Sequence, residues 1–275
     1  MPNRIGELSN GVQLLFLRTC AALSTIGLTG CSILLGIAMI SKSVHRHSTW
    51  FGFIFSWIVS SVSYLLLFFA GQLENLNPPF NLCLTQAALI YSAPPLTAAS
   101  TLSLIVQVYF NICDIICNQM RRKEDVRSMI LVVAPYFLHA AVTTGCLVLG
   151  LKIPSTVQRE DLETPYCNMV NRVPSKIASI SVVLMLVPTL CLEVLILRKL
   201  RKHWTIFRNQ KISLSTTLRV TIFSFFGALA VVISLIFAST KDRSPELNVI
   251  ISSCTLSHFL TVLANYMISS TQYPW

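Results

Sequence analysis

The chain alternates between long apolar segments and short polar connections. Each apolar segment holds about 20 residues or more, which is the length that an α-helix needs to cross a membrane. The segment 82–116 shows no polar stripe wide enough for a helix that faces water along one side. Seven spans are predicted, over residues 12–40, 50–71, 82–116, 128–151, 177–197, 218–239 and 247–269. The pattern therefore predicts an all-α integral membrane protein, a single seven-helix transmembrane domain over residues 1–275.

Composition and charge support this prediction and add an orientation. Hydrophobic residues make up 53% of the 275 positions and charged residues only 12%, too few charges for a soluble domain. The net charge of +10 is unevenly distributed. Counted with Asp114 and Arg219 at their borders, the connections after the first, third and fifth spans hold 13 of the 21 Lys and Arg residues but only three of the 11 acidic residues. The positive-inside rule then places the N-terminus outside and the C-terminus in the cytoplasm. We expect a multi-pass plasma-membrane protein whose basic face meets membrane lipid, not nucleic acid.

Nine cysteines are present, and two stand apart by position. Only Cys83 and Cys167 lie at or beyond the predicted outer boundary, where oxidation is possible. We predict a disulfide between them, which would pin the second outer loop to the start of the third span; the alternative is two free thiols. Cys113 and Cys117 form a C-x-x-x-C pair on a helix. No histidine or second cysteine pair accompanies them, so packing or palmitoylation is favoured over metal binding.

Taken together, these features resemble a G protein-coupled receptor: seven spans, an outside N-terminus, Cys83 opening the third span, Cys167 in the second outer loop and a basic third inner loop. The signature motifs of the rhodopsin-like class are absent. Residues 109–114 read Tyr-Phe-Asn-Ile-Cys-Asp where that class has Asp-Arg-Tyr, and the seventh span lacks Asn-Pro-x-x-Tyr. The resemblance is to a divergent receptor, and it implies signal transduction, an unknown extracellular ligand and a heterotrimeric G protein as partner.

Other function classes are less well matched. The seventh span has no lysine, so a retinal Schiff base is not expected, and we predict no cofactor. His45 and His47 are the closest histidine pair, with no acid near them, so an enzyme is not expected. The alternative is a seven-helix small-solute transporter. Such transporters contain two parallel three-helix repeats and usually a Pro-Gln signature, and this sequence shows neither.

A ligand cavity is expected among the outer halves of the spans, where polar and aromatic side chains gather. The predicted lining residues are Tyr64, Gln86, Tyr91, Ser92, Ser234, Phe237 and His258. The alternative for each is helix packing, because hydroxyl and small residues are common between membrane helices. His139 and His258 are more typical of hydrogen-bonded packing residues than of ligand contacts.

Ionisable groups within the spans are candidates for a switch, because charges are costly in lipid. Glu193 could pair with Arg198 or Arg219 and hold the inner ends of the fifth and sixth spans together. The alternative is a glutamate that extends to the head groups, and Asp114 is the other candidate partner of Arg219. The predicted switch and coupling residues are Asp114, Arg121, Arg122, Glu193, Arg198, Arg201, Lys202 and Arg219.

Overall fold

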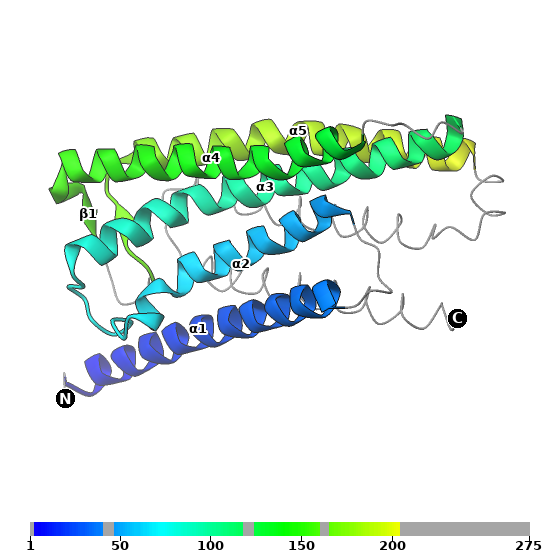
Figure 1. Cartoon of the computed structure of the whole chain (residues 1–275). Coiled ribbons are helices and arrows are strands. Elements are labelled where there is room, and N and C mark those ends of the chain that lie inside the picture. Colours follow the sequence, from blue (N-terminus) through cyan, green and yellow to red (C-terminus); the bar gives the residue numbers. More distant parts are fainter. Residues whose placement is uncertain (1–2, 41–46, 118–123, 160–164, 204–275) are drawn as a thin grey trace.

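The computed structural model describes residues 3–40, 47–117, 124–159 and 165–203 (Figure 1). This part of the chain forms five long helices. They are α1 (Asn3–Ile40), α2 (Ser48–Phe69), α3 (Phe80–Cys117), α4 (Glu124–Lys152) and α5 (Arg172–Lys202). Each contains a stretch long and apolar enough to cross a membrane. The first five predicted spans are thus confirmed as helices, whereas residues 218–239 and 247–269 lie outside the described residues.

Short elements connect α4 to α5. A 3-10 turn, η1 (Pro154–Thr156), leads into strand β1 (Val157–Gln158), which pairs antiparallel with β2 (Asn168–Met169). We call this two-stranded segment the hairpin. It lies at the end of the bundle where α2 meets α3 and α4 meets α5, here named the disulfide end (Figure 1). The opposite end, where α3 and α5 finish, is named the basic end.

Helix α3 is central, because it packs against α2, α4 and α5, while α1 packs against α2. It continues as a helix through Pro94 and Pro95, and the Thr97 hydroxyl donates to the carbonyls of Ala93 and Pro94 beside them. Small residues along its buried faces, such as Ala87 and Ala88, let neighbouring helices approach closely.

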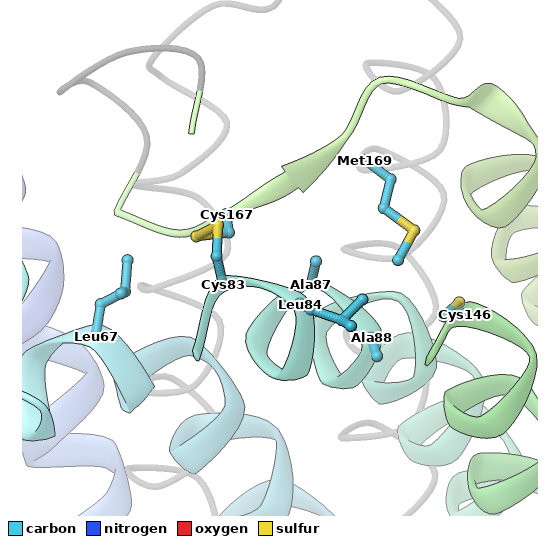
Figure 2. Packing of buried hydrophobic residues seen from close by; sticks show 8 residues of the cluster. All are labelled: Leu67, Cys83, Leu84, Ala87, Ala88, Cys146, Cys167 and Met169. Atoms are coloured by element: carbon cyan, nitrogen blue, oxygen red, sulfur yellow. A yellow bond between two sulfur atoms is a disulfide. The ribbon is translucent and has the colours of Figure 1, made fainter. Parts of the chain in front are cut away.

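Buried residues form clusters at three levels of the bundle. At the disulfide end, α3 and α4 pack beneath the hairpin through Leu84, Cys146 and Met169 (Figure 2). Further along, α1, α2 and α3 meet around Leu34 and Phe53. At the basic end, α3 packs on α5. That third cluster contains Ile105, Ile112, Ile196 and Leu200.

Many large apolar side chains of α4 and α5 are exposed, including Met129, Ile130, Phe137, Ile180 and Leu184. Water would be a poor solvent for so much apolar surface, whereas lipid accommodates it. The length and composition of the helices and this outward apolar surface agree that the chain is a membrane-embedded, mainly α-helical protein.

Candidate functional site

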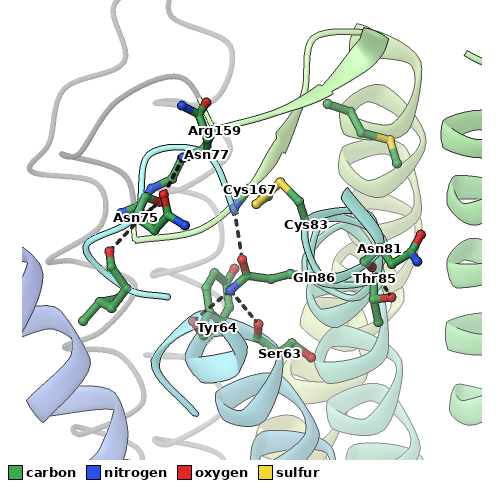
Figure 3. Close-up of a disulfide and its surroundings, with 12 residues drawn as sticks. Ser63, Tyr64, Asn75, Asn77, Asn81, Cys83, Thr85, Gln86, Arg159 and Cys167 are labelled. Carbon is green, nitrogen blue, oxygen red and sulfur yellow. Dashed lines mark hydrogen bonds between the residues drawn. A yellow bond between two sulfur atoms is a disulfide. The ribbon is translucent and has the colours of Figure 1, made fainter. Parts of the chain in front are cut away.

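At the disulfide end, a group of hydrogen-bonded polar residues surrounds a disulfide. Cys83, in the first turn of α3, is bonded to Cys167, just before β2, with the two Cα atoms 5.3 Å apart (Figure 3). The predicted disulfide is confirmed. Val157 pairs with Met169, and the Val170 amide donates to the Thr156 carbonyl at 2.8 Å. The hairpin is therefore ordered by its own backbone bonds and held covalently to α3.

Gln86 lies one turn below the disulfide and is fully buried. Its Oε1 accepts the Cys167 amide at 3.1 Å, and its Nε2 contacts the carbonyls of Ser63 and Tyr64 at 3.3 Å each (Figure 3). One side-chain amide thus joins α2, α3 and the hairpin. Its oxygen and nitrogen are both engaged, so in this structure Gln86 serves to position the hairpin.

Tyr91 makes the second polar attachment. Its hydroxyl accepts the Met169 amide at 3.3 Å and donates to the Met169 carbonyl at 3.4 Å. Gln86 and Tyr91 lie five residues apart on α3 and bind the backbone of residues 167 and 169. Two polar attachments and one covalent bond therefore fix the hairpin along the first turns of α3.

The remaining predicted ligand residues divide into two groups. The Tyr64 ring lies edge-on to that of Tyr166, with centroids 5.7 Å apart, and so also touches the segment leading to the hairpin. Ser92 accepts the Thr143 hydroxyl at 2.8 Å, a contact between α3 and α4 that fits helix packing. The other three predicted residues, Ser234, Phe237 and His258, lie outside the described residues.

Arg159 was not predicted from the sequence. It follows β1, is only 6% exposed, and donates from Nη1 to the carbonyls of Leu73 and Asn75 at 2.8 and 2.9 Å. Burial lowers the pKa of its guanidinium from the ordinary value. The side chain binds the hairpin segment to the α2–α3 connection. A lone arginine in a polar loop carries no sequence signal for such a role.

The basic end carries two cations that each lie over an aromatic ring of α3. The guanidinium of Arg127, on α4, is 4.4 Å from the Phe110 ring centroid and 3.8 Å from a carboxylate oxygen of Asp114. The ammonium of Lys199, on α5, is 4.6 Å from the Tyr109 ring centroid. Among the described residues, the ion-pair partner of Asp114 is Arg127; the predicted alternative, Arg219, is not among them. Arg121, Arg122 and Arg219 lie outside the described residues.

Glu193 and Arg198 point in different directions. Five residues separate them, so they lie about 140° apart around the helix axis. Glu193 is 4% exposed and Arg198 is exposed, and the described residues contain no ion pair between them. The Glu193–Arg198 pair is therefore absent from this structure. A side chain that reaches the head groups would be exposed, whereas Glu193 is buried. Its Oε1 has no hydrogen-bond partner among the described residues.

The remaining polar residues of α3, α4 and α5 differ in their contacts. Asn111 bonds His47 Nε2 at 3.0 Å and accepts from Gln107 at 2.8 Å, which links α3 to the start of α2. His139 is half-buried on α4. Within the described ranges, no group of three His, Cys, Asp or Glu residues is arranged to hold a metal ion. Arg201 and Lys202 are exposed at the end of α5.

Comparison with known proteins supplies no relative from which a function could be transferred. No protein-family model matches the chain, and no curated protein matches it.

Proposed function

We propose that this protein is a receptor-like signal transducer of the G protein-coupled type, with an extracellular ligand at its disulfide end. The observation that carries the proposal is the fixed hairpin. It is joined to α3 by Cys83–Cys167 and by the hydrogen bonds of Gln86 and Tyr91. Any ligand that contacts the hairpin thereby acts directly on the central helix of the bundle.

The two ends of the bundle support an orientation for this function. Structural disulfides persist in oxidising surroundings, which supports an outer position for the disulfide end. Exposed Arg198, Arg201 and Lys202 at the other end of α5 fit the cytoplasmic side. The charge distribution predicts the same orientation, with the N-terminus outside. We propose the plasma membrane as the site of action, because an extracellular ligand would reach the protein there.

In the proposed mechanism, a ligand shifts an equilibrium between two arrangements of the helices. It must bind one arrangement more tightly than the other, and its differential affinity limits the size of the shift. Helix α3 links the two ends, because Cys83 lies at its first turn and Cys113 and Asp114 lie in its last turns. The exposed cations at the end of α5 provide the surface for a heterotrimeric G protein.

The test is ligand-free recruitment of G proteins to the full-length chain in cells, measured by resonance energy transfer across a panel of Gα families. We expect basal recruitment that falls severalfold in the Arg201→Ala/Lys202→Ala variant. Charged residues at the edge of an interface mainly determine the rate at which the two proteins associate. Lys152→Ala is the matched control, since Lys152 is an exposed cation at the disulfide end. Absence of recruitment by every family at normal surface expression would refute coupling. Solute uptake by the same cells would instead support the transporter.

A further inference from the structure

A thiol and an ammonium group meet at the basic end, between α3 and α5. Lys199, in the last turn of α5, donates from Nζ to the sulfur of Cys113 at 2.9 Å. The same ammonium lies over the Tyr109 ring. The ring belongs to the preceding turn of α3, so one helix presents both the sulfur and the aromatic face to one cation.

This arrangement favours a reactive sulfur. A cation beside a thiol stabilises the thiolate, which is the nucleophilic form of cysteine. The aromatic face attracts the ammonium electrostatically and so helps to keep it at the sulfur. Cys117 lies one turn further along α3 and is more exposed than Cys113. In the part of the chain that the structure describes, Cys117 has no comparable contact with a cation. Exposure therefore favours reaction at Cys117, whereas the contact with a cation favours reaction at Cys113.

The surroundings indicate the class of co-reactant. Exposed Arg198, Arg201 and Lys202 at the end of α5 would attract a polyanionic group. On the same helix, Val194 and Leu195 are exposed apolar residues on the bilayer side of these cations. A molecule with an anionic head and a long apolar chain matches both features.

We propose that Cys113, activated by Lys199, is a site of S-acylation by a long-chain acyl thioester such as an acyl-coenzyme A. The Cys113 thiolate attacks the thioester carbonyl carbon, and a new carbon–sulfur bond forms. The original carbon–sulfur bond breaks, and the coenzyme thiolate leaves. That thiolate takes up the proton that the Cys113 thiol released, so the exchange needs no oxidant or reductant. The attached chain would extend into the bilayer beside the end of α3. This site is independent of G protein coupling.

The test uses the full-length chain expressed in cells. Free thiols are blocked, thioesters are cleaved with neutral hydroxylamine, and the released thiols are labelled and quantified per folded molecule. Folding is scored by formation of the Cys83–Cys167 bond on non-reducing gels. We expect Cys113→Ser and Lys199→Met each to lower the label by about tenfold, with Lys199→Arg close to wild type because it keeps the charge beside the sulfur.

Cys117→Ser is the matched control and should keep most of the label. The proposal is overturned if the label follows Cys117, if it is unchanged in Lys199→Met, or if the wild-type chain carries none. Mass spectrometry of the wild-type peptide containing residues 113 and 117 gives a measurement that does not depend on the folding of any variant. Acyl mass on residue 113 supports the proposal, and acyl mass only elsewhere refutes it.

Discussion

Replacing Gln86 by leucine should release the hairpin from the bundle while leaving the disulfide in place. The side chain is fully buried, and leucine removes both its acceptor and its donor. The Cys167 amide would lose its partner in a buried setting, which costs about 1–3 kcal/mol. The two contacts with α2 carbonyls are long, at 3.3 Å, so we assign them about 0.5 kcal/mol each. The expected loss in the free energy of hairpin docking is therefore about 2–4 kcal/mol.

Hydrogen exchange of the hairpin amides measures this quantity directly. Exchange at the amides of Cys167 and Met169 requires the hairpin to leave α3 locally, so its rate reports the opening equilibrium. A loss of about 2–4 kcal/mol corresponds to exchange faster by about 30-fold to several hundredfold, since 1.4 kcal/mol is a factor of ten. The disulfide prevents complete departure of the hairpin, so amides deep in α3 should change little.

Thr85→Val is the control for Gln86→Leu. Thr85 is adjacent and exposed, and the one hydrogen bond of its hydroxyl among the described residues goes to the Asn81 carbonyl within its own helix. Its loss should change exchange at Cys167 by less than about threefold. If Gln86→Leu also stayed within that range, Gln86 would not hold the hairpin. The argument that the hairpin acts on α3 through polar contacts would then be wrong.

Three further substitutions test the remaining contacts. Cys83→Ser and Cys167→Ser should lower surface expression equally, with the double variant no worse than either; additive losses would contradict the bond. Arg159→Met should lower the stability of the α2–α3 connection by about 1–3 kcal/mol, because it removes two hydrogen bonds to that connection. We expect faster proteolysis of the connection, and unchanged cleavage would show that Arg159 does not hold it. Glu193→Gln should leave the melting temperature equal or higher, because Oε1 lacks a partner among the described residues; a clear decrease would reveal one.

The sequence predicts the helices because membrane spans are defined by length and polarity, which a single sequence displays directly. It predicts their ends less well. α5 begins at Arg172 and continues through Lys202, beyond the predicted 177–197, because a helix can extend past the hydrocarbon core once its backbone bonds are formed. The disulfide was predictable for a related reason: the predicted topology leaves only two cysteines on the outer side.

Side-chain roles within the bundle are harder to predict. Gln86 and Tyr91 stood out as polar residues in an apolar helix, which fits a cavity and a backbone attachment equally well. Only the position of the hairpin decides between them, and that position depends on residues about 80 positions later in the chain. No sequence pattern predicts the role of Arg159, since its partners are backbone carbonyls of another loop. Glu193 could pair with Arg198 or Arg219 or extend to the head groups by sequence alone; helical rotation separates it from Arg198, and Arg219 lies outside the described residues.

The two ends of α3 are held in different ways, and this difference indicates where the helix can move. At the disulfide end, a covalent bond and buried hydrogen bonds fix it. At the basic end, Asp114 and Arg127 are about one-fifth exposed and 3.8 Å apart. Asp114 Oδ2 and Arg127 Nε and Nη2 are buried without hydrogen-bond partners among the described residues. A loose, partly desolvated ion pair contributes little net stability. We infer that α3 can exchange partners at the basic end at less cost than at the hairpin, so movement should concentrate on the side proposed to contact the G protein.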